Sequence, residues 1–222
     1  MFKQELVEAD YSLKQVNKKS GRIYVDDENN EYPSITSVLS ILSKDAIMKW
    51  RARVGEEEAN RVSSRAIKRG NKVHDMLENY VLNSYVSPTT HEAADLIALE
   101  NFNSIKPIID ENLSKVYATE KRMYSKHLGV AGTVDCVGVW NNKISIIDWK
   151  TSNKFKKKEW VTNYFMQCCA YAIMWEERTG TPITQIVVCI AGDQGPQIFV
   201  EHRDSWDQEL VETIDLYKRR KK

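Results

Sequence analysis

Hydrophobic positions in the first half of the chain recur at the spacing of an α-helix. The clearest set is Ala66, Val73, Leu77 and Val81, whose apolar side chains would fall on one helix face. The elements that this half of the chain predicts are a hairpin over 22–33 and helices over 34–42, 56–83 and 89–105. The N-terminal part is therefore expected to be mainly helical.

Beyond residue 115 the pattern changes to that of β-strands. Three β-rich stretches follow one another, and Asn141–Asn142 makes a tight turn between the last two. The pattern predicts an antiparallel meander over 116–124, 130–140 and 144–150, then a helix over 155–178, strands over 183–191 and 197–202, and a helix over 204–218.

This order of elements predicts an α/β fold in which helices flank a mixed sheet. The 222 residues fit one large domain, or one domain with an added helical lobe. We divide the chain into an N-terminal hairpin and helical lobe, 1–110, and a core, 111–222. The two parts are expected to form one compact domain.

The net charge of +1 limits how the chain could contact nucleic acid. A nearly neutral protein does not suit a permanent coat on DNA, so any such contact has to come from local basic clusters. One cluster is the run Lys154, Lys156, Lys157 and Lys158. The four cysteines form no CxxC pair, which argues against a zinc ribbon and favours buried free thiols.

Two carboxylates and a lysine form a candidate chemical centre. The turn at 141–142 folds the strand of Asp135 beside that of Asp148, so these residues are expected to be near cross-strand neighbours. Their carboxylates would repel each other unless a cation lay between them. Lys150 lies two residues after Asp148 and thus on the same strand face. Such a set could hold Mg²⁺ and hydrolyse a phosphodiester.

An Asp-x-Lys triplet by itself is also common as a charge pair on an exposed strand. Here the triplet follows the apolar stretch 144–147, which indicates a buried strand. Polar groups at the end of a buried strand require partners or a function.

The surrounding residues resemble a known nuclease family. Gly132-Thr-Val-Asp135, followed by Asp148-Trp-Lys-Thr-Ser152, is similar to the GxxD…DxKT core of the RecB-like branch of the PD-(D/E)XK nucleases. The resemblance implies a restriction-endonuclease-like core, a mixed sheet flanked by helices, with the helical lobe ahead of it.

Two helices and a strand extend the resemblance. Arg69-Gly-Asn-Lys-Val-His74 is similar to the RG…H helix of that branch, and Gln167-Cys-Cys-Ala-Tyr171 to its QxxxY helix. Glu120 matches a recurrent acidic position on the preceding strand. The resemblance covers roughly residues 32–200 and is nearest to small stand-alone exonucleases, including those of phages and of mitochondrial genome maintenance.

The resemblance implies a role for each matched residue. The catalytic residues would be Asp135, Asp148, Lys150 and Glu120. The metal ligands would be His74, Asp135, Asp148 and the backbone carbonyl of Trp149. Contacts with nucleic acid would come from Arg69, Thr151, Ser152, Lys154, Gln167 and Tyr171.

Simpler roles stay open for several of these residues. His74 could be an ordinary helix histidine, and Glu120 could pair with neighbouring basic side chains. Gln167 and Tyr171 could be polar residues at the edge of the core. The lysines of 154–158 could form a solvated face or contact phosphates. We expect the nearby aromatic residues to lie in the core rather than beneath stacked bases; they are Trp160, Tyr164 and Phe165.

The sequence thus predicts a Mg²⁺-dependent DNA exonuclease, for which Mn²⁺ could substitute, acting at free DNA ends in DNA replication, recombination or repair. A preference for single strands is a further expectation. The cysteine positions do not match those of iron–sulfur relatives, so no iron–sulfur cluster is expected. A structure- or sequence-specific endonuclease and a catalytically idle nucleic-acid-binding module stay as alternatives. A recombinase or a single-strand-binding protein is conceivable as a partner, but the sequence names neither.

The N-terminal segment 1–15 mixes acidic and basic residues and has no apolar core of a signal peptide. No run approaches the length of a membrane span, so no membrane partner is expected. The expected location is the cytoplasm, which would be that of the host if a phage encodes the protein.

Overall fold

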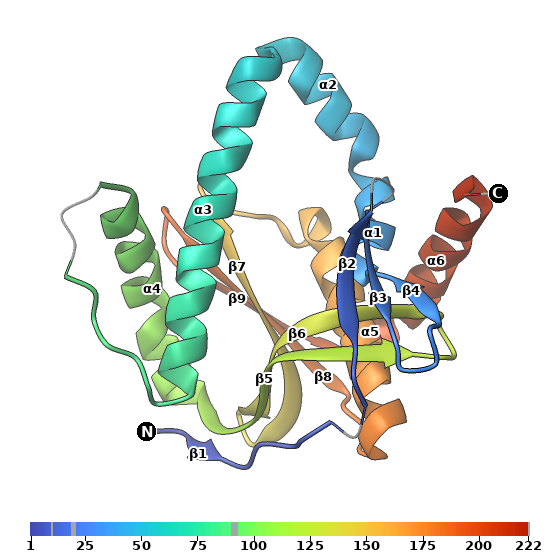
Figure 1. Ribbon diagram of the computed structural model, residues 1–222. Helices are drawn as coiled ribbons and strands as arrows, with labels where there is room; N and C mark the ends of the chain where they lie inside the picture. The colour runs from blue at the N-terminus through green and yellow to red at the C-terminus, as the bar shows by residue number, and fades with distance from the viewer. Residues whose placement is uncertain (10, 19–20, 90–92, 222) are drawn as a thin grey trace.

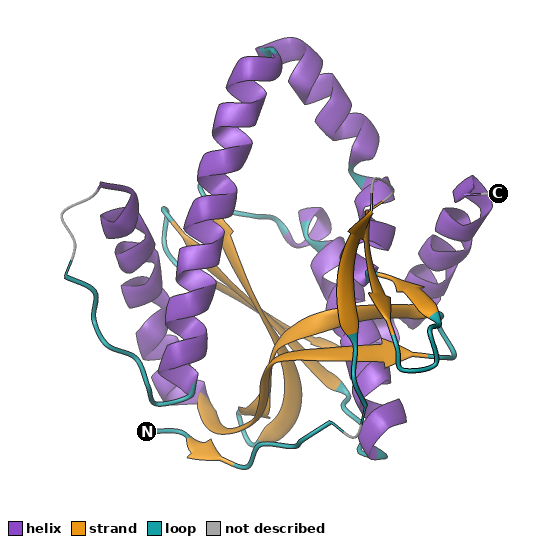
Figure 2. Ribbon diagram, in the orientation of Figure 1, coloured by secondary structure: helices purple, strands orange, loops and turns teal. Residues whose placement is uncertain are grey.

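A six-stranded mixed sheet forms the centre of the computed structural model, which describes residues 1–9, 11–18, 21–89 and 93–221 (Figures 1 and 2). In order across the sheet, its strands are β1 (Lys3–Gln4), β5 (Leu113–Ser125), β6 (Val130–Trp140), β7 (Lys143–Ser152), β8 (Gln185–Gly192) and β9 (Gln197–His202). Strand β8 runs parallel to β7, whereas β6 runs antiparallel to both of its neighbours, β5 and β7. The α/β fold with a mixed sheet is therefore confirmed.

The predicted meander is present as β5, β6 and β7. Asn141 and Asn142 have φ values of 49° and 63°, in the left-handed region that asparagine tolerates better than most residues. This conformation matches the twist of the two flanking strands. The local sequence of the turn is thus enough to bring β6 beside β7.

Helices cover both faces of the sheet. Helices α5 (Thr162–Thr179) and α6 (Asp207–Lys221) belong to one face, where Ile146 of β7 and Phe165 of α5 lie in the same buried cluster. Helices α3 (Glu56–Val81) and α4 (Ala93–Asn112) cover the other face, where Ile147 and Trp149 are buried. Successive residues of β7 therefore point to opposite layers, as strand geometry requires.

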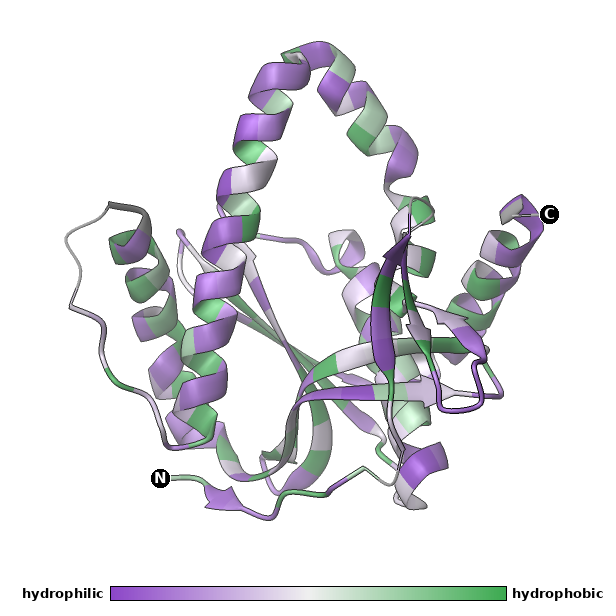
Figure 3. Cartoon of the chain, in the orientation of Figure 1, coloured by the Kyte–Doolittle hydropathy of each residue, from purple (hydrophilic) through white to green (hydrophobic). Residues whose placement is uncertain are grey.

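The N-terminal residues form a small sheet and a helical arch. The small sheet consists of β2 (Lys14–Lys18), β3 (Gly21–Val25) and β4 (Glu31–Pro33), and the helices that follow are α1 (Ile35–Leu39) and α2 (Lys44–Val54). Helices α2 and α3 meet at Gly55, where φ is 85°, and form an arch above the large sheet (Figure 1). Figure 3 shows mixed, largely hydrophilic colouring along the upper arch, in keeping with an α2 that buries no residue.

The hydrophobic pattern does not predict α2, β1 or β2. The apolar side chains Ile47 and Met48 of α2 are exposed, so they do not form the stripe that marks a packed helix. Strand β2 is exposed along its whole length, and β1 has two residues. The small sheet extends the predicted hairpin, β3 and β4, by one strand.

The predicted helix over 155–178 is wrong at its start, because α5 begins at Thr162. The backbone N–H groups of Phe155 and Lys156 donate to the side chains of Gln194 and Gln197, at 2.9 and 2.7 Å. A helix could not use the same groups for its own bonds. The end of the helix agrees with the prediction, since Gly180 has the left-handed conformation of a C-cap.

Helices α3 and α4 of the predicted N-terminal lobe pack directly on the sheet, and β1 pairs with β5. The division of the chain near residue 110 stays a prediction.

Among the described residues, no helix is both long and apolar enough to cross a membrane.

Candidate active site

Three carboxylates meet where β5, β6 and β7 lie side by side. Strand β5 pairs with β6 on both sides of Glu120, as Thr119 with Cys136 and Lys121 with Val134, so Glu120 lies level with Asp135. Cys136 pairs with Ile147, so Asp135 and Asp148 lie at the adjacent cross-strand position. The Oδ2 atom of Asp135 accepts a hydrogen bond of 2.8 Å from the backbone N–H of Trp149. The expected cross-strand proximity of Asp135 and Asp148 thus follows from the meander.

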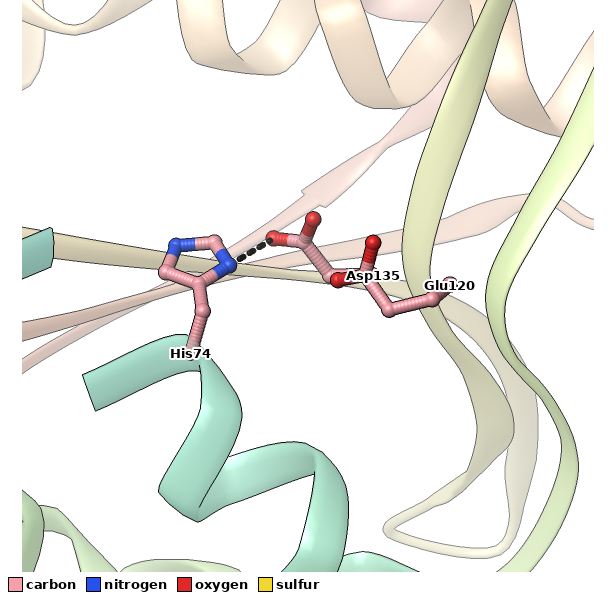
Figure 4. Close-up of side chains that lie close together, drawn as sticks. All are labelled: His74, Glu120 and Asp135. Atoms are coloured by element: carbon pink, nitrogen blue, oxygen red, sulfur yellow. Dashed lines mark ion pairs between the residues drawn. The ribbon is translucent and has the colours of Figure 1, made fainter. Parts of the chain in front are cut away.

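His74 reaches this place from α3. Its Nδ1 atom lies 3.7 Å from Oδ2 of Asp135 (Figure 4). One ligand atom from each of His74, Glu120 and Asp135 lies within 4.8 Å of the other two. Two carboxylates with one imidazole fit a small divalent cation such as Mg²⁺ or Mn²⁺, for which oxygen donors are preferred.

Asp148 and Lys150 form a buried ion pair beside this group. The Nζ atom of Lys150 lies 2.6 Å from Oδ1 and 2.5 Å from Oδ2 of Asp148, which is 1% exposed. Gln167 of α5 donates a hydrogen bond of 3.1 Å to the same carboxylate. The structure therefore places Asp148 against Lys150 rather than in the group of His74, Glu120 and Asp135, and its role as a metal ligand stays a prediction.

The charges of the site shift the pKa values of its members. Partial desolvation and the neighbouring Asp135 raise the pKa of Glu120 to about 7, although its side chain is still exposed to solvent. Burial raises the pKa of Asp148 to about 6 against the opposing effect of Lys150. Burial also lowers the pKa of His74, and Lys150 lowers it further, so the imidazole is neutral at pH 7 and can donate a lone pair.

Lys150 is held in its charged form. Burial by itself lowers the pKa of this ammonium, but Asp148 and Asp135 more than offset the effect and hold it above its ordinary value. Its Nζ atom also lies 5.1 Å from the ring centroid of Tyr164. A lysine in this state acts by charge and hydrogen bonding, because it has no lone pair to accept a proton.

Tyr171 packs against β6 at a position that requires glycine. A Cβ atom added at Gly132 would come within 2.6 Å of the Tyr171 ring. The Tyr171 hydroxyl lies 3.3 Å from Nε2 of Gln167, which in turn bonds Asp148. Gly132, Gln167 and Tyr171 thus support the carboxylate from behind. At Gly70, by contrast, an added Cβ would make an ordinary contact of 3.6 Å with Thr151, so proximity to that neighbour does not account for the glycine.

A cavity of about 630 Å³ opens onto these groups. Residues of α3 line one side, among them Gly70 and His74, and residues of β3 and of the segment leading into α1 line the other. The sequence did not single out several of the lining residues: Arg22, Tyr24, Ser34, Thr36, Asp75, Glu78 and Thr133. Thr133 lies inside the GxxD motif and could have been found, but the others meet the site through tertiary packing.

The remaining predicted contacts lie outside the cavity lining. Arg69 forms an ion pair of 3.1 Å with Asp193 and donates a hydrogen bond of 2.6 Å to Asn153. The hydroxyl of Ser152, which is buried, donates to the backbone carbonyl of Lys154. Arg69 and Ser152 therefore hold two loops in place. Thr151 is half-buried and Lys154 is exposed, and their contacts with nucleic acid stay predictions.

Residues 47–221 match the sequence profile of the PD-(D/E)XK nuclease superfamily. The chain belongs to this superfamily. The match includes the strands of all three carboxylates, the His74 helix and the Gln167 helix. The site described above is thus the expected place for the chemistry of a PD-(D/E)XK nuclease.

Curated relatives of this nuclease carry an exonuclease name. It is 28% identical over 137 residues to human mitochondrial genome maintenance exonuclease 1, covering 58% of this chain and 39% of that protein. The Xenopus tropicalis protein of the same name is 22% identical over 225 residues, covering 87% of this chain and 59% of that protein. The nuclease therefore spans about two fifths to three fifths of the length of these relatives.

Among solved structures, a protein from Eubacterium rectale described as a candidate exonuclease superposes with a TM-score of 0.46 at 16% identity. The overlap covers 68% of this chain and 65% of that one. The assignment to the superfamily rests on the sequence match.

Proposed function

We propose that this PD-(D/E)XK nuclease is a divalent-metal-dependent DNA exonuclease that acts at free ends. The observation that carries the proposal is the group His74, Glu120 and Asp135, set beside the Lys150 ammonium in a cavity beneath the arch. The exonuclease names of the curated relatives support the same activity.

The residues of the site would divide the work of hydrolysis. His74, Glu120 and Asp135 would hold the cation, with Asp148 and the Trp149 carbonyl as further candidate ligands. A bound divalent cation supplies charge neutralisation at the phosphate and makes nearby water more acidic. Lys150 would orient the attacking water and offset the charge that grows on the phosphate oxygens. Gln167 would keep the Asp148 carboxylate, and through it Lys150, in place.

The arch supports dependence on ends. The cavity lies between α3 on one side and β3 and the start of α1 on the other. The chain runs from α1 through α2 to α3 without a break, so these two sides are joined above the cavity (Figure 1). A strand that reaches the site through this passage would have to be threaded, which a free end permits and a covalent circle does not.

The test compares a circular single-stranded DNA with its linear form in Mg²⁺. We expect the linear strand to be degraded and the circle to survive, with Lys150→Ala inactive on both as a control. Cleavage of both forms would replace the proposal by an endonuclease with the same centre. Binding without cleavage of either would indicate an idle binding module.

A further inference from the structure

We infer that the loop between β7 and α5 is a second contact surface for the substrate, one that stacks unpaired bases on Phe155 and Trp160. The inference rests on the proposed function, because it extends the active site along the nucleic acid. The loop, residues 153–161, leads from the strand of Lys150 to the helix of Tyr164. Figure 2 shows it between these two elements, in teal up to the 3₁₀ turn Lys158–Trp160. We call it the platform loop.

The exposure of its aromatic side chains is the first observation. The chain contains 5 Phe, 6 Trp and 10 Tyr, all of them among the described residues. Only Phe155 and Trp160 of this set are exposed, at 59% and 63%. The expectation that Trp160 lies in the core is therefore wrong, whereas Phe165 is fully buried as expected. Two exposed rings in one short loop indicate a binding surface, because scattered exposure would not place both there.

The second observation is the rigid anchoring of the loop backbone. Asn153 accepts a hydrogen bond from Arg69, and Phe155 donates its N–H to Gln194. Lys156 both donates to and accepts from the Gln197 side chain, at 2.7 and 2.8 Å. A backbone tied at these points presents its side chains outward in a set arrangement. The loop therefore holds its aromatic side chains at the surface before a ligand binds, so little further conformational entropy is lost on binding.

Charge favours nucleic acid as the occupant. Lys154, Lys157 and Lys158 are exposed beside the rings, and Lys157 lies over the Trp160 ring at 5.5 Å from its centroid. Lys158 also pairs with Glu201 at 2.6 Å. A basic strip with interleaved aromatic rings is the arrangement that binds single strands, since phosphates meet the ammonium groups and unpaired bases stack on the rings.

Continuity with the active site supports the same occupant. The strand before the loop and the helix after it approach each other at the centre, because Nζ of Lys150 lies 5.1 Å from the ring centroid of Tyr164. A strand whose phosphate lies at Lys150 would pass onto the platform loop, which begins directly after the strand of Lys150. An acidic segment of a partner protein would satisfy the lysines as well, and the test separates it from nucleic acid.

The experiment measures binding of an oligothymidylate of about 12 nucleotides and of an abasic strand of equal length and charge. Binding is followed by fluorescence anisotropy in EDTA, so that both strands stay intact. We expect the wild type to prefer the thymidylate by at least about 30-fold, in line with stacking on two rings. The double variant Phe155→Ala/Trp160→Ala should bind both strands equally, at the affinity of the abasic strand. The matched control Val211→Ala, which removes an exposed apolar side chain from α6, should keep the wild-type preference.

Lysine variants test the charged part separately. Lys154→Gln/Lys157→Gln should weaken the binding of both strands by the same factor. The slope of the logarithm of the binding constant against the logarithm of the salt concentration should become shallower by about 0.7 for each lysine. Lys143→Gln, at the opposite end of β7, is the matched control. Thermal melting verifies that each variant is folded.

Three results would overturn the inference: no preference for bases in the wild type, an unchanged preference in the double aromatic variant, or binding of a labelled acidic peptide with no binding of either strand. The proposed function fails independently of these results. If the wild type stacks bases but leaves linear DNA intact in Mg²⁺, the platform loop stands and the nuclease proposal falls. If linear DNA is cut without any preference for bases, the nuclease proposal stands alone.

Discussion

At the scale of single residues, Lys150 has the environment that most restricts its chemistry. It is 19% exposed, contacts both oxygens of Asp148, and is held in the charged form by two carboxylates. Its contribution to catalysis should therefore be electrostatic and orienting. Asp148, at 1% exposure, depends on Lys150 and Gln167 for its polar contacts.

The first prediction separates Lys150 from Asp148. Lys150→Ala should lower the rate of cleavage by roughly 10²–10⁴-fold and leave the Mg²⁺ concentration for half-maximal binding nearly unchanged, because only the ammonium is lost. If Asp148 is a ligand, Asp148→Ala should also abolish cleavage, but with a clear increase in that concentration. Single-turnover rates and metal titrations by calorimetry measure the two effects. Lys143→Ala, at the far end of the same strand, should cut normally. A near wild-type rate for Lys150→Ala would contradict the assigned centre.

Glu120 combines backbone strain with an unfavourable charge. Its φ of 43° lies in the left-handed region, which is uncommon for glutamate. Its pKa is raised to about 7 by partial desolvation and by Asp135. Strain of this kind persists where the surrounding structure imposes it, and it is often found at functional sites. A bound cation would relieve the charge repulsion.

The second prediction follows from the sign of this shift. The folded pKa of about 7 exceeds the ordinary 4.5, so the metal-free unfolding free energy falls as the pH rises through this window. Glu120→Gln should therefore raise the Tm of the metal-free protein at pH 8 by about 2–4 °C, equivalent to about 1 kcal/mol, because solvent in the cavity screens the full effect. The gain should vanish at pH 4. Glu111→Gln, at the exposed end of α4, is the control, and an equal gain at both pH values would count against the shift.

At the scale of elements, α2 differs from every helix that packs on the sheet. It buries no residue and contacts mainly α3 and the 3₁₀ turn Ser40–Leu42. Helix α5, by contrast, buries ten residues, from Phe165 to Trp175. Local stability follows burial, so the arch should open far more readily than the core helices.

The third prediction concerns exchange of backbone amides. In the free protein, amides of α2 should exchange at least about 100-fold faster than those of α5, since few buried contacts oppose local opening. Added linear single-stranded DNA with Ca²⁺ should slow exchange in α2 and leave α5 unchanged. Hydrogen–deuterium exchange with mass spectrometry measures both. Equal protection of the two helices in the free protein would show that the arch is not a separately opening element.

At the scale of the whole molecule, a bound divalent cation should increase both the stability of the fold and the activity. The near-neutral net charge gives no strong general attraction for DNA, so under the proposed function the candidate centre and local basic surfaces would have to provide it. Glu120, Asp135 and Asp148 lie close together on three adjacent strands, and the repulsion between their carboxylates destabilises the metal-free fold.

The fourth prediction is that a divalent cation raises both Tm and activity. EDTA should abolish cleavage, and Mg²⁺ or Mn²⁺ should restore it. Ca²⁺ should support DNA binding with little turnover, because its looser coordination positions water poorly. Saturating Mg²⁺ at about 100 times its Kd should stabilise the fold by about 2.7 kcal/mol, seen as a higher Tm by calorimetry. Full activity in EDTA would exclude this centre.

His74→Ala should reduce the increase in Tm that Mg²⁺ causes, whereas His127→Ala, which lies outside the cavity lining, should not.

The sequence by itself determined the features that depend on local geometry. Alternation along 130–150, with the asparagine turn, places Asp135 opposite Asp148, and strand periodicity places Lys150 beside Asp148. The helix spacing of Gln167 and Tyr171 puts both on one face, where they contact each other. Each of these arrangements follows from residues close in sequence or joined by one tight turn.

Only the tertiary structure decided which distant groups share the site and which side chains stay exposed. His74 meets Glu120 and Asp135 because α3 packs across the sheet, and no local pattern encodes that approach. Packing buries Asp148 beside Lys150, and the attraction between the two charges, which is strong away from bulk water, offsets part of the cost of removing them from water. Trp160 is exposed because side chains of the β8–β9 hairpin hold the preceding backbone out of a helix. Hydrophobicity alone predicts that a tryptophan is buried. Here the side chains of Gln194 and Gln197 accept hydrogen bonds from the backbone N–H groups of Phe155 and Lys156, so this segment does not form the helix that the sequence predicts.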